Sequence, residues 1–490
     1  MNDSIYPEPP EALVKPGLKH AMTYLGPGVI IASVTIGSGE LVYAARSGAI
    51  FGYGLLWCFL YAGLFKAVQV YTAARHFTLT GEHPIVSWSQ LPGPPLWFPL
   101  LIAVPAVVLM PIAFSAIPEI LGGYVHRLAG VQQQSHDVFV WAHLEFWINV
   151  WSSLVLVVCL MLALCSNYTL LERVSTFVLG AIVLCVGISV ITIGPHLTEL
   201  LTGLLVPRMP EYPDWLLTTP KYAAEFSDRS PWLEVSVYLG AVGGGAYDYI
   251  GYIGMLRDKK WGRAGRRPLS RADLETALST ESTASLTMQR AKQWTRAPLF
   301  DTVASFFFVI LVTLLFAVLA ALVLHSVPVV PANNDLLNEQ EMFLSRWHNG
   351  LRWVYRLGVF LAFIGTLYGA FEVYQRTFVE SALAIAPKLA TPQRIQATRH
   401  GVVAYCFLGG LLMVWLPEVI AGNIIQRVTF GGIISGAASC GLWCFAMLWI
   451  DQVRLPKPLR MSLPLRLLTF IAGLAMTSLG IFIIFEYFSG

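Results

Sequence analysis

The stretch GPGVIIASVTIGSGELVYAARSGAIFGY, residues 26–53, decides the fold of this chain. Its apolar run is long enough to cross a bilayer, but Gly37, Ser38 and Gly39 interrupt it and Glu40 follows at once. Glycines weaken a helix, and a carboxylate at membrane depth is unfavourable unless it meets a partner or water. A plain membrane anchor would contain neither feature. We therefore expect an interrupted helix whose break has a function.

The composition indicates a membrane protein. The 490 residues are 56% hydrophobic and 12% charged, with a net charge of +3 and a mean hydropathy of +0.63, whereas soluble domains carry about 25% charged residues. We expect an all-α polytopic membrane protein in contact with a lipid bilayer, and the small net charge gives no reason to expect nucleic acid as a partner. The sequence contains no motif of a soluble enzyme or nucleotide-binding domain. The chain is therefore expected to be neither an enzyme nor a carrier of a cofactor.

Eleven apolar segments are long enough to span a bilayer. They lie at about 22–46, 51–77, 97–125, 140–165, 169–206, 232–256, 298–326, 351–376, 399–421, 424–450 and 464–488. The segment 257–296 carries ten Lys/Arg against four Asp/Glu, and such an excess marks the cytoplasmic side. This places residues 1–19 in the cytoplasm as a flexible tail and the C-terminus outside, in what we expect to be a bacterial inner membrane.

A second span repeats the design of the first. Residues 243–245 are three consecutive glycines in the centre of the sixth span, and Asp248 follows three residues later. Corresponding interrupted helices in two halves of a chain indicate a transporter with a midplane site between inverted repeats. We therefore predict a five-plus-five inverted repeat, with residues 20–206 as the first repeat, 232–450 as the second and 464–488 as an added eleventh span.

The two breaks define the candidate substrate site. Broken helices expose carbonyl groups that suit a cation and N–H groups that suit an anion. The acids favour a cation, with Glu40 and Asp248 as the candidate metal ligands. The alternative is that each acid caps its own half-helix or pairs with an arginine such as Arg46. The candidate substrate-binding residues are Gly37, Ser38, Gly39, Glu40, Gly244, Gly245, Tyr247, Asp248 and Tyr249.

Three other charged residues lie inside predicted spans. Glu119 in the third span, Glu372 in the eighth and Lys66 in the second are candidates for coupling or for support of the site. Lys66 could neutralise one of the two acids. Each of the three is equally compatible with a structural hydrogen-bonding role.

The residues around the first break resemble the NRAMP divalent-metal transporters, which have the LeuT-type fold. The resemblance rests on Gly26-Pro27-Gly28 and on the run from Phe51 to Trp57, FGYGLLW, at the family's spacing, with weaker similarity at 119–122, 170–174 and 239–240. This register places Gly37-Ser38-Gly39-Glu40 on the family's DPGN motif. It places Tyr247-Asp248-Tyr249 on the family's MPH motif.

The departures from the family pattern concern the substrate. The methionine position is Tyr247, so the thioether that favours soft transition metals is absent, and the remaining oxygen ligands favour Mg or Mn. The family's titratable positions in spans three and six fall on Ala116, Tyr249 and Gly254. The comparison predicts transport of a hard divalent cation without the usual proton coupling, or with coupling through the carboxylates that remain.

Two other interpretations stay open at this stage. A glycine-lined break also suits a carrier of a small organic solute such as an amino acid, whose amine would bind Asp248 or Glu40. A sensor or receptor of the same fold, with 257–296 as its output segment, is the third interpretation. The sequence makes no prediction of the oligomeric state.

Overall fold

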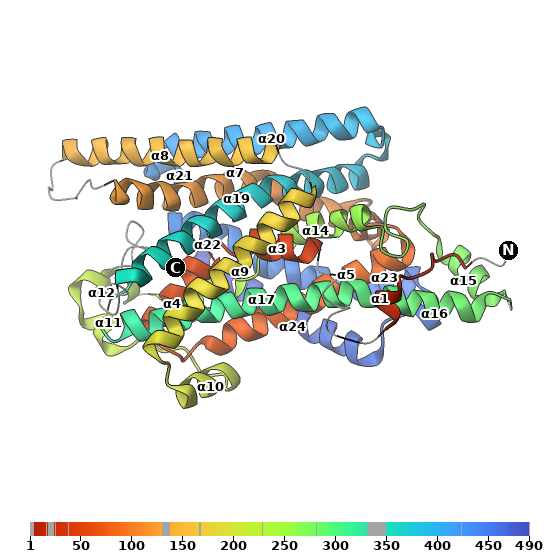
Figure 1. Ribbon diagram of the computed structural model, residues 1–490, viewed down its shortest axis with the longest axis horizontal. Coiled ribbons are helices and arrows are strands. Elements are labelled where there is room, and N and C mark those ends of the chain that lie inside the picture. Colours follow the sequence, from red (N-terminus) through yellow and green to blue (C-terminus); the bar gives the residue numbers. More distant parts are fainter. Residues whose placement is uncertain are drawn as a thin grey trace.

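The fold is a bundle of long helices that run roughly parallel to one another (Figure 1). The computed structural model describes residues 4–15, 17, 24, 26–37, 39–129, 138–165, 168–227, 229–280, 282–327, 329–331, 349–422 and 424–489. The long helices of this part are α5 (Leu56–Thr80), α7 (Trp97–Leu128), α8 (Val138–Cys165), α9 (Tyr168–Ile193), α17 (Arg296–Ala320), α19 (Asn349–Ile385), α20 (Pro392–Trp415), α23 (Ser439–Arg454) and α24 (Leu463–Ser489).

Shorter helices form the breaks, the connections and the two ends of the bundle. They are α1 (Glu11–Val14), α3 (Pro27–Thr35), η2 (Gly39–Ala44), α4 (Ala45–Phe51), α6 (Pro84–Ser87), η3 (Trp88–Gln90), α10 (Leu197–Leu205), α11 (Asp214–Thr218), α12 (Pro220–Phe226), α13 (Pro231–Ala241), α14 (Ala246–Lys259), α15 (Arg271–Ser279), α16 (Ala284–Trp294), η4 (Ala321–His325), η5 (Pro387–Leu389), α21 (Glu418–Ala421), α22 (Ile424–Gly431), η6 (Gly432–Ala438) and η7 (Lys457–Leu459).

Helices lie at all eleven predicted span positions in the described part of the chain, with two corrections to the boundaries. The fifth span ends at Ile193 instead of continuing to 206. Gly194 has a φ of 81° and is followed by Pro195, which removes a backbone donor, so α10 is a separate helix. The second span begins at Leu56 because Gly52, with a φ of 57°, ends α4.

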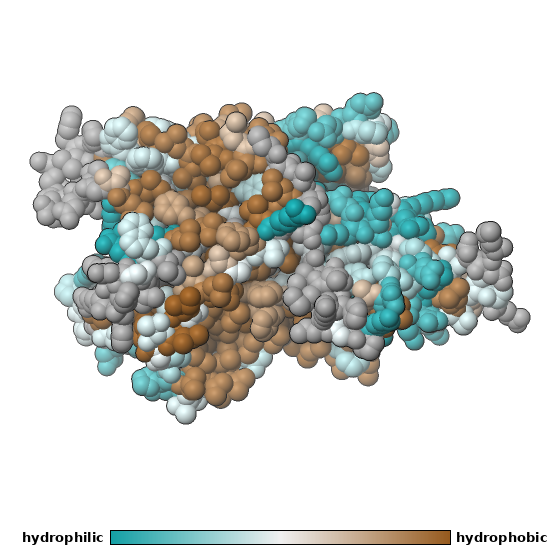
Figure 2. Space-filling view, viewed as in Figure 1, coloured by the Kyte–Doolittle hydropathy of each residue, from teal (hydrophilic) through white to brown (hydrophobic). Residues whose placement is uncertain are grey.

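The surface is that of an integral membrane protein. Among the described residues, seven helices are long and apolar enough to cross a membrane, and the pair Pro27–Thr35 and Glu40–Phe51 forms one more candidate bent by 53°. Large apolar side chains are exposed on the outer helices, among them Val104, Leu164, Ile191, Leu412 and Phe485. Figure 2 shows a hydrophobic zone across the middle of the molecule, with hydrophilic residues gathered at the end that holds α15 and α16.

The two interrupted spans lie in the interior. The α3 helix packs against α9, α17 and α19, and α14 packs against α19 and α3. The helices α8 and α20 pack with α7 at one side of the bundle (Figure 1). The breaks are therefore surrounded by helices from both predicted repeats. The repeat boundaries themselves stay a prediction.

The N-terminal segment 4–15 is docked, which corrects the prediction of a flexible tail. Tyr6 is fully buried, and its hydroxyl donates to the Leu79 carbonyl at the end of α5 (2.9 Å). Side chains of the basic segment donate to carbonyls of the tail: Arg263 to Ile5 (2.9 Å), Arg290 to Tyr6 (3.1 Å) and Trp294 to Pro7 (2.9 Å). The tail and the basic segment therefore form one structure at this end of the bundle.

Replacing Tyr6 with alanine should release this tail. The variant loses a buried ring and a buried hydrogen bond, worth about 3 kcal/mol or more together. We expect amide hydrogens of residues 4–15 to exchange at least about 100-fold faster, measured by hydrogen exchange with mass spectrometry. The variant Glu8→Ala, at an exposed position of the same segment, should exchange like the parent. Unchanged protection in the Tyr6 variant would show that the ring does not hold the tail.

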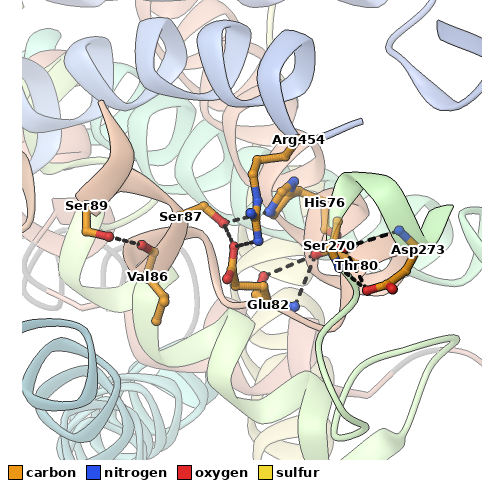
Figure 3. A network of polar contacts seen from close by, with 9 residues as sticks. All are labelled: His76, Thr80, Glu82, Val86, Ser87, Ser89, Ser270, Asp273 and Arg454. Atoms are coloured by element: carbon orange, nitrogen blue, oxygen red, sulfur yellow. Dashed lines mark hydrogen bonds and ion pairs between the residues drawn. The ribbon is translucent and has the colours of Figure 1, made fainter. Parts of the chain in front are cut away.

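A polar network fixes the same end of the bundle (Figure 3). The Glu82 carboxylate accepts hydrogen bonds from Arg454 at the end of α23 (2.6 Å) and from Ser87 on α6 (2.5 Å). His76 on α5 hydrogen-bonds the same serine hydroxyl (3.0 Å). The ends of α5 and α23 are thus joined by an ion pair through the short loop that contains Glu82.

Candidate functional site

The first break separates α3 from the π-helical turn η2. The last regular hydrogen bond of α3 joins the Ile36 N–H to the Ala32 carbonyl (3.1 Å). The freed Ile36 carbonyl accepts a hydrogen bond from the Thr366 hydroxyl of α19 (2.6 Å). The Gly37 N–H is shared between the Thr35 carbonyl (3.0 Å) and Oε2 of Glu40 (3.1 Å). The Thr366 hydroxyl therefore satisfies a carbonyl at the break, and Glu40 adds a second acceptor for the Gly37 N–H.

The second break separates α13 from α14. Gly243 and Gly244 both have a φ of 77°, a backbone conformation that residues other than glycine rarely adopt. A Cβ on Gly244 would also lie 2.3 Å from Cγ2 of Thr35 in the first break, so the two breaks touch. The Gly245 N–H donates to Oδ2 of Asp248 (2.7 Å), which caps the start of α14.

Glu40 joins the two breaks directly. Its Oε1 accepts a hydrogen bond from the Gly243 N–H of the second break (2.7 Å), while its Oε2 accepts from Gly37 in its own break. The side chain is fully buried. Both acids therefore cap backbone N–H groups, as the capping alternative expected. Arg46 is not the partner, because its Nε lies 3.5 Å from the Glu234 carboxylate instead.

Lys66 contacts the second break through carbonyl groups. Its ammonium donates to the carbonyls of Gly240 (3.0 Å), Val242 (2.5 Å) and Gly244 (2.8 Å). The sequence suggested that Lys66 could neutralise an acid by pairing with it. In the described part of the chain its hydrogen-bond partners are these backbone oxygens, so it supports the break.

A cavity of about 150 Å³ opens between the two breaks. Among the predicted site residues, Gly37, Gly244, Gly245, Tyr247 and Asp248 line it. Glu40 and Tyr249 are not in its lining, and the Tyr249 hydroxyl donates to the Gly243 carbonyl (2.6 Å). Ser38 lies outside the described residues. Asp248 is therefore the predicted metal ligand that faces this space.

The lining of the cavity also contains residues that the sequence analysis missed. These lining residues include Arg427 of α22 and two residues of α19, Thr366 and Tyr374. Arg427 forms a two-pronged ion pair with Glu119, with a distance of 2.8 Å from Nη1 to Oε1. Two opposite charges inside predicted spans were a signal for this pair, but the residues are 308 positions apart. Glu372 is not in the lining and pairs with Arg376 on its own helix (2.7 Å).

The described residues contain no group of three or more His, Cys, Asp and Glu side chains that could hold a metal ion. Asp248 is the acidic residue in the lining of the cavity. A cation in this cavity would therefore use the Asp248 carboxylate together with hydroxyl, carbonyl or water oxygens. Such a ligand set suits a hard ion that keeps part of its hydration shell.

Two broken helices that meet inside an all-helical bundle define a membrane protein of the LeuT type. Residues 28–219 match the family described as natural resistance-associated macrophage protein-like, Nramp. This part of the chain is therefore similar to the Nramp family. This agrees with the resemblance seen around the first break.

Curated relatives match the same part of the chain. A metal transporter, Nramp6 of Arabidopsis thaliana, is 29% identical over 203 residues, which cover 40% of this chain and 34% of the relative. Natural resistance-associated macrophage protein 2 of Mus musculus is 26% identical over 214 residues, or 42% of this chain and 34% of the relative. The matched region thus spans about a third of the length of these relatives.

Solved structures extend the likeness to nearly the whole fold. The manganese transporter of Eremococcus coleocola superimposes with a TM-score of 0.56 at 13% identity, covering 96% of this chain and 89% of that one. MHP1, a transporter of the nucleobase-cation-symport-1 family, gives a TM-score of 0.50 at 12% identity, covering 94% and 93%. The predicted LeuT-type fold is confirmed.

Proposed function

We propose that this chain is a secondary transporter that carries a hard divalent cation, Mg or Mn, through the cavity between its two broken helices. The observation that carries the proposal is the position of Asp248, whose carboxylate caps α14 and lies in the wall of a cavity lined by both breaks. The Nramp-like sequence of residues 28–219 and the fold shared with a manganese transporter support the same class of cargo.

The chemistry of the cavity favours a hydrated hard ion. Carboxylate, hydroxyl and carbonyl oxygens are the ligands that Mg and Mn prefer, and Tyr247 stands where the family pattern has methionine. Mg keeps several of its waters when bound, and a cavity of about 150 Å³ has room for several water molecules. Glu40 uses one oxygen for each break, so we propose that it holds the site together, and its direct ligation of the ion stays a prediction.

Transport without coupled protons follows from the residues at the family's titratable positions. Ala116 lines the cavity and cannot bind a proton. Gly254 packs near Arg376 and Glu380, and the Tyr249 hydroxyl is held by a carbonyl. Four carboxylates remain as candidates for coupling. Glu119 and Glu372 are in ion pairs with arginines, and Glu40 and Asp248 accept backbone N–H groups.

We also propose that the end formed by the docked tail and segment 257–296 faces the cytoplasm of a bacterial inner membrane. The helices α11 and α12 lie at the opposite end of the bundle (Figure 1). Segment 257–296 has the Lys/Arg excess that marks a cytoplasmic side.

Purified protein in liposomes tests the function. We expect influx of Mg and Mn above that of protein-free liposomes, with a panel of amino acids measured in parallel. Flux of an amino acid without flux of either metal would replace the cation with an organic solute as cargo. Absence of all flux would favour a sensor of the same fold.

A pH-sensitive dye inside the same liposomes tests the coupling. With a membrane potential that drives cation entry, we expect metal influx without acidification of the lumen. The ionophore-treated liposome, in which protons equilibrate freely, gives the full scale of the dye signal. Acidification that depends on both the protein and the metal would contradict the uncoupled mechanism.

A further inference from the structure

The ammonium of Lys66 uses all of its hydrogen-bonding capacity on one segment of backbone. Lys66 lies on α5 with 1% of its surface exposed. It donates to the carbonyls of Gly240, Val242 and Gly244 at 3.0, 2.5 and 2.8 Å. An ammonium has three donors and no acceptor. Three carbonyl oxygens from alternate residues thus surround one positive charge.

The backbone conformation of the second break brings these carbonyls together. The left-handed conformations of Gly243 and Gly244 turn the chain after Val242, so that oxygens from both sides of the turn converge on one point. A Cβ on Gly243 would lie 3.6 Å from Cδ of Lys66, which shows that the turn wraps the lysine closely. The sequence GGG at 243–245 therefore serves the lysine contact as well as the cavity.

Three other backbone groups of the turn have hydrogen-bond partners as well. The Gly243 carbonyl accepts from the Tyr249 hydroxyl (2.6 Å), the Gly243 N–H donates to Glu40 and the Gly245 N–H donates to Asp248. Within the described residues these three backbone groups of the second break thus have partners from the chain itself. Freed carbonyls of a broken helix are groups that would otherwise coordinate a small cation such as Na⁺.

We propose that Lys66 is a tethered cation that fills a monovalent-cation site formed by the carbonyls of Gly240, Val242 and Gly244. The ammonium is a compact point charge, like a monovalent ion, and it cannot leave. The protein therefore needs no free ion to hold the second break, and this carbonyl cluster is closed to ions from solution. In this proposal Lys66 positions the second break and excludes free ions from it. The proposal rests on the geometry of the break and does not depend on which substrate is transported.

The test is a thermal-unfolding assay of detergent-purified variants in different salts. Lys66→Met removes the charge and the three donors, so we expect its melting temperature to fall by several degrees in choline chloride. NaCl, KCl or n-butylammonium chloride should restore at least half of the loss. Tetramethylammonium chloride, whose cation has the charge but no N–H donor, should restore none. The proposal would be overturned if the Lys66→Met variant melts like the parent in choline chloride. It would also be overturned if NaCl, KCl, n-butylammonium chloride and tetramethylammonium chloride all change its melting temperature equally.

The matched control is Gln69→Met, three residues further along α5. Gln69 is fully buried, as Lys66 is. The melting temperature of the Gln69→Met variant should not depend on the choice of salt. The parent provides a measurement that does not require a variant to fold. Because its carbonyl cluster is filled, NaCl, KCl and choline chloride should stabilise it equally, and a specific stabilisation by Na⁺ or K⁺ would overturn the proposal. Since no step of the assay measures transport, its outcome is independent of the liposome experiment.

Discussion

Replacing Asp248 with asparagine should abolish metal transport while leaving the fold intact. The amide oxygen of asparagine can still accept the Gly245 N–H that the carboxylate now accepts at 2.7 Å, so the cap on α14 remains. The negative charge in the wall of the cavity is lost. Changes to groups that only support a metal ligand already reduce affinity about 10–100-fold, so loss of the ligand itself should reduce metal flux at least that much.

The measurement is initial Mg and Mn influx into liposomes, with the melting temperature of the same preparation. Asp258→Asn is the matched control, because Asp258 lies on the same helix, is exposed and pairs with Arg376 (3.0 Å) outside the cavity. We expect the control to transport like the parent. If Asp248→Asn also transports like the parent, the carboxylate is only a helix cap and the proposed site is wrong.

The position of both breaks could be predicted because glycine runs and acids inside apolar segments are local signals. Gly37 and Gly243 mark the ends of regular helix in the structure as in the sequence. The cap of Asp248 on α14 is also local, since its partner Gly245 is three residues away. These features depend on a few neighbouring residues, and the periodicity of the flanking helices supports them.

The contacts between the breaks could not be predicted in the same way. The direction of Glu40 depends on the π-helical turn Gly39–Ala44, and an interrupted helix leaves the phase of the next residues undefined. Its partner Gly243 is 203 residues away. The ion pair of Glu119 with Arg427 is a contact of the same kind. Apolar periodicity shows which segments cross the membrane but not which polar side chains meet inside it.

The tail shows how composition alone can mislead. Residues 4–15 are polar and proline-rich, a composition typical of mobile segments. Their order comes from Tyr6, which is buried against α5, and from hydrogen bonds given by arginines more than 250 positions away. One aromatic residue in a polar segment was the signal available, and its partner could not be read from the chain.

Replacing Glu40 with glutamine should destabilise the protein more than any other conservative change at the site. The Glu40 carboxylate accepts hydrogen bonds from the N–H groups of Gly37 (3.1 Å) and Gly243 (2.7 Å). Glutamine keeps one acceptor oxygen, so its NH₂ group would face the N–H of one of these two glycines. Hydrogen bonds to charged groups contribute about 1.5–3 kcal/mol, and a buried donor without an acceptor costs about 1–3 kcal/mol. We therefore expect a loss of about 2–5 kcal/mol in the free energy of unfolding.

The melting temperature and the yield of folded protein measure this loss, and metal influx per folded molecule separates stability from transport. Glu145→Gln, at an exposed position of α8, makes the same chemical change at the surface and should leave both quantities unchanged. If Glu40→Gln melts like the parent but loses metal influx, Glu40 is a metal ligand and not the link between the breaks. A large fall in melting temperature, with metal influx retained per folded molecule, would assign Glu40 to the scaffold and leave ion binding to Asp248. The two acids that look equivalent in the sequence would then have separate roles, because only one of them lines the cavity.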